Sequence, residues 1–311
     1  MSKTAFLFPG QGSQAPGMAQ SLASASQAAR DVLAQVDEAL GQNLSALMAD
    51  GPADELTLTA NAQPALFASS LAVCAAIAEH SGKSLDAFGH MVAGHSLGEY
   101  SALSAVGVFD VATGAKLLRI RGDAMQAAVP VGEGAMAALI GADIALADKI
   151  VAKAEATGAV QIANDNAPGQ VVLSGSLVAV QAAMAIAQEE GLKRVVQLPV
   201  SAPFHSELMQ PAADAMAVAL GDTDFNAPSL PVMCNVTAGL EDNADALRDN
   251  LITQVTGRVR WRESLEAMAA SGVTRFIEIG TGKVLSGLVK RTVKDVEIIS
   301  VETADDIAAH F

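Results

Sequence analysis

One segment of the chain has the residue types and spacing of a nucleophilic catalyst. Gly94-His95-Ser96-Leu97-Gly98 is a G-x-S-x-G motif between the apolar run 91–93 and the helical stretch 98–106. In a nucleophile elbow the glycines allow a sharp strand-to-helix turn, which exposes the serine hydroxyl, and the next backbone N–H can stabilise an oxyanion. The simpler alternative is a tight turn with a capping serine. The context favours Ser96 as nucleophile and the Leu97 N–H as oxyanion donor.

A serine nucleophile needs a base, which narrows the search to the histidines. The chain has five: His80, His90, His95, His205 and His310. The first two flank a polar loop and the last lies at the chain end, so all three are expected at the surface. His95 adjoins the nucleophile on a sharp turn, which favours a structural role. His205 lies in the irregular loop 198–206, and such loops often carry catalytic groups. Because no acid stands out beside it, we predict a Ser96–His205 dyad.

The helical stretch 111–128 contains a cation on its apolar side. Its apolar stripe, at i, i+3, i+4 spacing, consists of Gly114, Leu117, Leu118, Arg121, Met125 and Ala128. An inward guanidinium is costly unless it meets an anion, and its planar shape suits a carboxylate. Two alternatives follow: an internal salt bridge, or a site that selects substrates with a carboxylate.

Short apolar runs alternate with alanine-rich helical stretches, which predicts an α/β protein with a mainly parallel sheet. Strands are expected at 4–8, 91–93, 232–235, 275–278 and 296–301. Helices are expected at 21–40, 64–80, 98–106, 111–128, 207–220, 244–252 and 262–270. Between 134 and 200 the order becomes strand 135–140, helix 144–156, strands 160–162 and 171–174, helix 178–190 and strand 194–198. This βαββαβ order predicts an inserted ferredoxin-like subdomain.

Composition excludes several classes of function. With 34 Asp+Glu against 19 Lys+Arg the net charge is −15, which disfavours nucleic-acid binding. The N-terminal apolar run is too short for a signal sequence, and the uncharged stretch 56–78 contains amides, hydroxyls and a proline, so it is expected to be a loop running into a buried helix. We therefore expect a cytoplasmic protein without a membrane span. Cys74 and Cys234 have no metal-ligand spacing and are expected as buried free thiols.

Two further local patterns bear on ligands. The glycine-rich segments 10–14 and 280–283 lack P-loop and dinucleotide spacing, so no nucleoside triphosphate chemistry is expected, although segment 10–14 follows a strand and can line an α/β site. Segment 258–294 holds eight basic and three acidic residues. An acidic partner could dock there, or the charges could form ordinary solvated helix faces.

Together these residues closely resemble the malonyl-CoA:acyl carrier protein transacylases, the acyltransferases of fatty-acid synthesis. The resemblance spans nearly the whole chain and rests on seven segments: 8–14, 94–100, 119–122, 134–137, 164–170, 202–206 and 280–285. It implies an α/β-hydrolase-like core, here residues 1–130 and 199–311, with a ferredoxin-like subdomain at 131–198. It implies no metal and no organic cofactor.

The resemblance also implies roles for individual residues. Ser96 would be acylated, with His205 as its base and the N–H groups of Gln11 and Leu97 as the oxyanion hole. Arg121 would hold the malonyl carboxylate, with Met125 and Phe204 also contacting the substrate, and the bulk of Phe204 resembles the malonyl rather than the methylmalonyl type. A main-chain carbonyl at Gln254 would orient the histidine.

The implied reaction transfers malonyl from malonyl-CoA to the phosphopantetheine thiol of acyl carrier protein, by a ping-pong route through malonyl-Ser96. The acidic carrier would dock near the basic segment 258–294. Three alternatives remain open: a serine thioesterase or esterase, a non-catalytic carrier-binding scaffold, and a malonyl transferase that serves a polyketide pathway.

Overall fold

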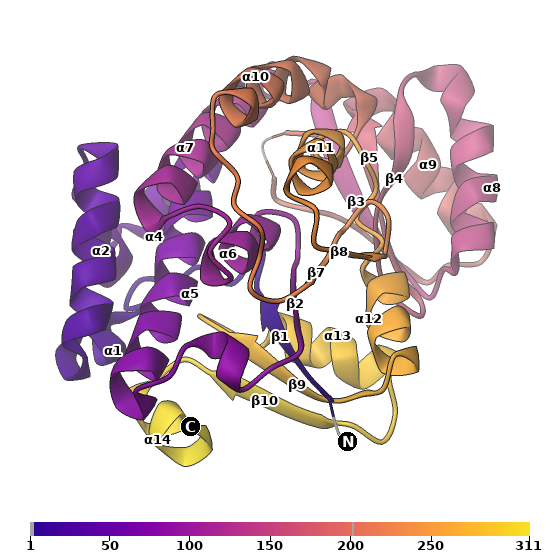
Figure 1. Cartoon of the computed structure of the whole chain (residues 1–311). Coiled ribbons are helices and arrows are strands. Elements are labelled where there is room, and N and C mark those ends of the chain that lie inside the picture. The colour runs from indigo at the N-terminus through magenta and orange to yellow at the C-terminus, as the bar shows by residue number, and fades with distance from the viewer. Residues whose placement is uncertain (1–2, 201) are drawn as a thin grey trace.

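The computed structural model describes residues 3–200 and 202–311, and a six-stranded sheet lies at its centre (Figure 1). In spatial order this sheet consists of β10 (Glu297–Val301), β9 (Val273–Ile279), β1 (Lys3–Phe8), β2 (Met91–Gly94), β7 (Val232–Met233) and β8 (Leu240–Glu241). All its neighbouring strands are parallel except β7 and β8. The predicted α/β fold with a mainly parallel sheet is therefore confirmed.

Helices cover both faces of this sheet because successive strand side chains point to opposite sides. In β1, Phe6 and Phe8 belong to one hydrophobic core, and Ala5 and Leu7 belong to another. The second core is closed by α12 (Trp261–Ala270) and α13 (Val284–Thr292). The first core is closed by the remaining helices around the large sheet: α1 (Gln20–Ala25), α2 (Gln27–Leu40), α3 (Leu44–Asp50), α4 (Ala53–Thr57), α5 (Thr59–Ser81), α6 (Gly98–Ala105), α7 (Val111–Ala127), α10 (Gln210–Gly221), α11 (Ala244–Gln254) and α14 (Ala304–His310). Short 3₁₀ turns occur at Leu85–Ala87 and Glu207–Met209.

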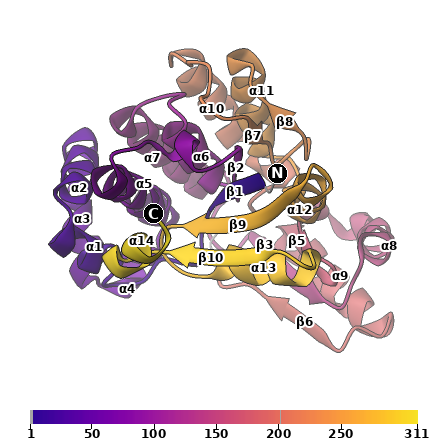
Figure 2. The same cartoon turned by 60° about the horizontal axis from the view of Figure 1, so that its bottom comes forward.

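A second, four-stranded antiparallel sheet projects from the large one (Figure 2). Its spatial order is β4 (Val160–Ala167), β5 (Gln170–Ser176), β3 (Gly134–Ile140) and β6 (Arg194–Gln197). The helices α8 (Ile144–Ala154, followed by a 3₁₀ turn at Glu155–Thr157) and α9 (Leu177–Glu189) pack on one face. The βαββαβ order and this strand arrangement confirm the expected ferredoxin-like unit. We keep 131–198 as its proposed boundaries.

The other face of the small sheet packs on the main core. Ala135 and Ala137 of β3 point toward α8 and α9, whereas Met136 and Ala138 belong to the first core of the large sheet. Alternation along one strand thus buries both faces of the sheet, one under its own helices and one against the larger unit.

A polar seam joins the two units, formed by residues 163–165 of β4 and 259–262 around the start of α12. The Asp165 N–H donates to the Val259 carbonyl at 2.9 Å. Arg262 contacts the Asp165 carboxylate, with Nη2 at 2.8 Å from Oδ2, and the Asp165 side chain is only 1% exposed. An ion pair of this kind fixes the orientation of one unit on the other.

Two predicted helix boundaries are wrong. The stretch predicted as one helix at 21–40 is split at Ser26, whose extended backbone ends α1 and whose Oγ accepts the Ala29 N–H at 3.0 Å to begin α2. The uncharged stretch 56–78 is almost entirely helical, because α5 begins at Thr59 and continues through Pro64. Within the described residues α5 is the one helix long and apolar enough to span a membrane, but 83% of its apolar window is buried inside the protein.

Other elements differ from expectation in smaller ways. Strand β4 continues to Ala167, five residues beyond its predicted end, and α3, α4, α13, α14 and the short β8 were not predicted. Both cysteines are free, but only Cys234 is fully buried. Cys74 is half-buried, so the expectation for it was wrong, because α5 exposes part of its last turns.

Candidate active site

Ser96 lies on a sharp turn between β2 and α6. Its φ of 54° is left-handed, a conformation that L-residues seldom adopt and that is held only by strong surroundings. The flanking glycines make the turn sterically feasible: a Cβ on Gly94 would lie 1.8 Å from the Gly98 carbonyl oxygen, and one on Gly98 would lie 2.2 Å from the Phe8 carbonyl oxygen. The structure therefore has the elbow geometry that the motif predicts.

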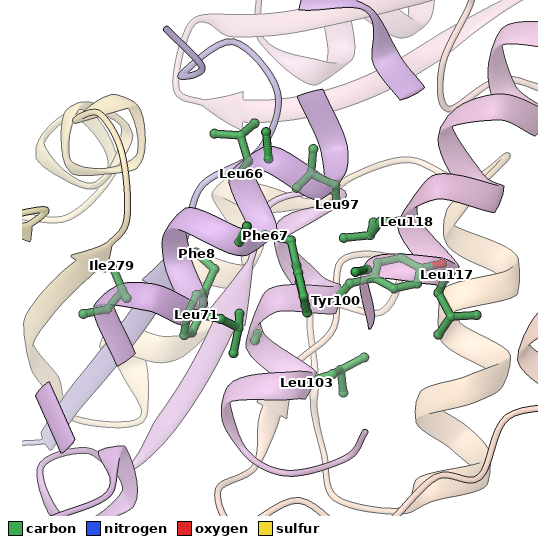
Figure 3. Close-up of a cluster of buried hydrophobic side chains, with 14 of the residues drawn as sticks. Phe8, Leu66, Phe67, Leu71, Leu97, Tyr100, Leu103, Leu117, Leu118 and Ile279 are labelled. Atoms are coloured by element: carbon green, nitrogen blue, oxygen red, sulfur yellow. The ribbon is translucent and has the colours of Figure 1, made fainter. Parts of the chain in front are cut away.

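The helix behind the elbow is fixed by hydrophobic packing. Figure 3 shows Leu97, Tyr100 and Leu103 of this segment among apolar side chains of the strands and neighbouring helices, which include Phe8, Leu66, Phe67, Leu71, Leu117, Leu118 and Ile279. Tyr100 and Leu103 are fully buried. A rigid α6 holds the serine at a constant position relative to the sheet.

Asn235, which follows β7, fixes the backbone of the elbow from the neighbouring strand. Its Nδ2 donates to the Gly94 carbonyl at 2.7 Å, and its Oδ1 accepts the Ser96 N–H at 2.7 Å. Both ends of this fully buried amide are thereby used on the elbow. This contact satisfies backbone groups that a sharp turn would otherwise leave unpaired.

Ser96 and His205 form a hydrogen-bonded pair. Ser96 Oγ lies 2.7 Å from His205 Nε2, and His205 Nδ1 lies 2.9 Å from the main-chain oxygen of Gln254. A carbonyl oxygen can only accept, so Nδ1 carries the proton and Nε2 accepts from the serine hydroxyl. Burial, reinforced by the charge of Arg121, lowers the pKa of His205 to about 3, so the imidazole is neutral at pH 7.

Arg121 points into the same site, as its apolar stripe predicts, and is 2% exposed. Its Nη2 donates to Ser96 Oγ at 3.2 Å and to Gln254 Oε1 at 2.9 Å, and its Nη1 donates to Gln63 Oε1 at 2.7 Å. Within residues 3–200 and 202–311 it makes no ion pair, since its hydrogen-bond partners are neutral. Of the two alternatives for this cation, the internal salt bridge is therefore not what the structure shows.

These groups open into a cleft of about 360 Å³ between the two units. It is lined by Gln11, Gly12, Gln14, Thr57, Gln63, His95, Ser96, Leu97, Arg121, Met125, Met136, Asn164, Asn166, Val172, Leu198, Pro199, Val200, Phe204 and His205. Met125 and Phe204, the other expected substrate contacts, are 1% and 8% exposed. One end of the cleft is thus polar and charged, and the side near β3 and β5 is apolar.

The two expected oxyanion donors lie at the carboxyl ends of adjacent strands. Gln11 follows β1 and Leu97 follows β2, and both line the cleft. In the described part of the chain neither backbone N–H donates to another protein group. Both amides are therefore available to an oxygen that develops charge beside Ser96.

The other histidines occupy the positions expected for them. His80, His90 and His310 are exposed. His95 has structural contacts: its Nε2 lies 2.8 Å from Asn166 Oδ1, and its ring meets Trp261 edge-on at 5.3 Å between centroids. Burial lowers the pKa of His95, so it braces the elbow as a neutral ring.

Sequence reasoning missed three buried polar residues around the site. Gln63 holds Arg121, Asn235 holds the elbow, and Glu99 accepts a hydrogen bond from Gln254. Glu99 could have been found from its position, because it is the one charged residue in the helix Gly98–Ala105 that follows the nucleophile. No local signal marks Gln63 and Asn235, whose partners are 58 and 139 residues away in the chain.

Comparison with known proteins agrees with this geometry. Residues 5–306 match the acyl transferase domain family. The malonyl CoA-acyl carrier protein transacylase of Bacillus subtilis is 46% identical over 99% of this chain and 96% of its own.

Solved structures give the same result. The acyl-carrier-protein S-malonyltransferase of Bartonella henselae has a TM-score of 0.97 at 52% identity, covering 99% of this chain and 98% of its own. A malonyl-transacylase solved in complex with a type II polyketide acyl carrier protein has a TM-score of 0.95 at 40% identity, covering 99% of both chains. Ser96, the neutral His205 and Arg121 converge in one cleft, and the matched family and relatives agree with that arrangement: this chain belongs to the acyl transferase family and, within it, to the malonyl CoA-acyl carrier protein transacylases.

Proposed function

We propose that the protein transfers the malonyl group from malonyl-CoA to the phosphopantetheine thiol of acyl carrier protein, through an ester on Ser96. The observation that carries this proposal is the position of Arg121, whose Nη2 lies 3.2 Å from Ser96 Oγ. A buried cation with neutral partners, beside an activated hydroxyl, suits an acyl group that ends in a carboxylate. Membership of the family supports the same substrate.

In the first half-reaction His205 Nε2 takes the proton of Ser96 Oγ as this oxygen bonds to the thioester carbon of malonyl-CoA. The carbonyl oxygen becomes negative and accepts hydrogen bonds from the Gln11 and Leu97 N–H groups. When the carbon–sulfur bond breaks, the electron pair leaves on the CoA sulfur, which receives the proton from His205. Malonyl-Ser96 and CoA thiol result.

In the second half-reaction the same groups act on the carrier. His205 takes the proton of the phosphopantetheine thiol, whose sulfur attacks the ester carbon. The carbon–oxygen bond then breaks, and His205 returns the proton to Ser96 Oγ. Malonyl is now a thioester on the carrier, no net oxidation has occurred, and no cofactor is required. Such a double displacement gives ping-pong kinetics.

Intact-protein mass spectrometry tests the nucleophile and the substrate together. Wild type and Ser96→Ala are each incubated briefly with malonyl-CoA, with acetyl-CoA and without a thioester. We expect a malonyl adduct on wild type alone and little or no acetyl adduct. Rapid thioester loss without an adduct would indicate a thioesterase instead, and neither adduct nor turnover would indicate a non-catalytic scaffold.

We further propose that the acidic carrier docks on part of segment 258–294. Arg258, Arg260, Arg262 and Arg275 are each paired with an acidic side chain, so their charge is largely compensated. Lys283, Lys290 and Lys294 are exposed, have no ion pair among the described residues, and line one surface groove. We name these three the lysine groove.

The Lys283 end of the lysine groove lies near the loop that carries Gln11. A Cβ on Gly282 would lie 3.0 Å from the Ser13 Cβ, so the turn before α13 touches the segment that follows β1. A carrier that covers the Lys283 end of α13 would therefore sit close to one rim of the cleft. Its negative surface would be attracted by these three lysines, which form no ion pair within the part of the chain that the structure describes, on a protein whose net charge is −15.

Charge reversal tests this docking surface. Replacing Lys283, Lys290 and Lys294 with Glu is expected to raise the KM for the carrier by about tenfold, mainly at low salt, and to leave the KM for malonyl-CoA unchanged. A matched triple reversal of the exposed Lys83, Lys116 and Lys193 changes the net charge equally and serves as control. Equal effects of the two triples would exclude the lysine groove as the docking site.

The physiological pathway and compartment are part of the proposal. We place the protein in the cytoplasm, where it supplies fatty-acid synthesis. Because one structural relative was solved with a polyketide carrier, steady-state kinetics with carriers of both kinds is the appropriate comparison. A higher kcat/KM for the polyketide carrier would indicate that the protein serves polyketide synthesis instead.

A further inference from the structure

Glu99 is a buried acid in direct contact with the active-site residues, and the mechanism above gives it no task. It lies in the first turn of α6, three residues after Ser96, and is 1% exposed. Its Oε2 accepts the Gln254 Nε2–H at 2.7 Å and the Asn235 N–H at 3.2 Å. These are the two residues that hold the base and the elbow, so one carboxyl group contacts both supports.

The direction of the Gln254 amide matters for Arg121. This amide has an accepting end, Oε1, 2.9 Å from Arg121 Nη2, and a donating end, Nε2, which also reaches the Ser96 carbonyl at 3.0 Å. A guanidinium can only donate, so the amide must present its oxygen to Arg121. The acceptors on the opposite side, Glu99 Oε2 at 2.7 Å and the Ser96 carbonyl at 3.0 Å, stabilise this orientation over the flipped one, and Glu99 makes the shorter contact.

Gln254 also orients the ring of His205. The main-chain oxygen of Gln254 accepts from His205 Nδ1 at 2.9 Å, at the last residue of α11. A side chain that is held at both ends restricts the backbone of its own residue. Gln254 therefore couples the orientation of the base to the orientation of the carboxylate-binding cation.

We propose that Glu99 is a positioning residue which, by fixing the amide of Gln254, aims Arg121 at the acyl carboxylate and thereby sets the preference for malonyl over unsubstituted acyl groups. The assignment rests on the proposed malonyl transfer. This role requires a hydrogen-bond acceptor at position 99 and does not require that the acceptor carry a charge. Burial raises the pKa of Glu99 to about 7, and both its ionised and its neutral form offer an acceptor oxygen.

Two substitutions at this position separate the acceptor from other properties. Glu99→Gln keeps the shape and one acceptor oxygen, whereas Glu99→Leu keeps the approximate volume and offers none. We expect Glu99→Leu to lower the malonyl-to-acetyl ratio of kcat/KM by about tenfold, since the Gln254 amide loses its shorter Nε2 contact and no longer keeps its oxygen directed at Arg121. Glu99→Gln should keep that ratio within about twofold of wild type. If Glu99→Gln lowers the malonyl-to-acetyl ratio as much as Glu99→Leu does, the assignment is overturned.

The acyl ratio is the decisive measurement because a purely structural role would not change it. A general loss of packing would lower the melting temperature and reduce both substrates in proportion, and that result would refute positioning through Gln254. If Glu99→Leu does not fold, Gln254→Leu removes the contact with Glu99, together with the side-chain acceptor of Arg121, and keeps the main-chain oxygen. It should lower the ratio at least as much, and an unchanged ratio would again overturn the proposal.

A double substitution tests whether Glu99 acts through Gln254. When Gln254→Leu is already present, Glu99→Leu should lower the ratio no further, because no Gln254 amide is left for Glu99 to hold. Additive losses would contradict the assignment. The wild-type mass experiment described above is run in parallel. A wild type that forms no malonyl adduct refutes the proposed function, whereas a wild type that does, with Glu99→Leu retaining its preference, refutes only the role of Glu99.

Discussion

Two buried or partly buried arginines, one in the cleft and one in the seam, show how surroundings decide what the same side chain does. Arg262 is a quarter exposed and contacts the carboxylates of Asp165 and Glu266. Its charge is used within the protein, where it helps to hold the small sheet against the large unit. Arg121 is almost fully buried and contacts the neutral amides of Gln63 and Gln254.

The two arginines differ in whether the guanidinium is already paired with a carboxylate of the protein. Neutral amides satisfy the hydrogen-bonding geometry of Arg121 and, among the described residues, no carboxylate forms an ion pair with it, so a carboxylate that enters the cleft gains a favourable electrostatic interaction. A second carboxylate would gain little at Arg262, which is already paired. A cation is thus available for substrate binding where the fold surrounds it with polar but uncharged partners.

The comparison predicts its largest effect at Arg121. With Arg121→Ala, kcat/KM for malonyl-CoA should fall by about 100-fold, because a hydrogen-bonded charge contact of about 2.7 kcal/mol is lost. Acetyl-CoA should be affected much less, since its methyl group never used the guanidinium. Single-turnover acylation of Ser96 with each thioester measures both rates. An unchanged preference for malonyl would contradict the role of Arg121.

At Arg262 the opposite pattern is expected, a loss of stability without a change of selectivity. Arg262→Met leaves the Asp165 carboxylate buried and unpaired, which costs about 3 kcal/mol and lowers the melting temperature by several degrees. The malonyl-to-acetyl ratio should stay at the wild-type value. Adding Asp165→Asn removes the unpaired charge and should recover part of the stability. A changed acyl ratio in Arg262→Met would show that the two arginines are not separable.

The smallest effect concerns pH. Burial, and then the charge of Arg121, lower the pKa of His205 from 6.5 to about 3, so the base stays neutral as the pH falls through 6.5. Wild-type acylation should therefore change by less than about twofold between pH 8 and pH 5.5. Without the Arg121 charge the pKa of His205 should rise part of the way toward 6.5, and Arg121→Ala should lose activity over the same range.

Stability, unlike the acylation rate, should decrease as the pH falls. Between pH 6.5 and 3 an unfolded chain protonates this histidine and the native protein does not, so the contribution of His205 to the free energy of unfolding decreases as the pH falls. Thermal unfolding of wild type and His205→Gln across pH 5 to 7 measures this contribution. A steeper pH dependence in the variant than in wild type would contradict the lowered pKa.

The sequence by itself determined the local features. The glycines around Ser96 have no substitute on so tight a turn, the apolar stripe of α7 places Arg121 inward, and the βαββαβ order of the insertion follows from short-range periodicity. Helix boundaries that depend on one capping contact or one proline, as at Ser26 and Pro64, were not recovered, because such contacts differ little in energy between alternative ends. The helices α13 and α14 were missed as well.

Only the tertiary structure decided what each polar group pairs with. Whether Arg121 meets an acid or an amide depends on Gln63 and Gln254, which lie 58 and 133 residues away in the chain and come together only when α5, α7 and α11 pack. The same holds for Glu99, whose contacts with Asn235 and Gln254 join three distant segments. Residue types and spacing specify turns and faces because these are short-range steric and hydrophobic effects, whereas the charge state and partners of a buried site are set by long-range packing.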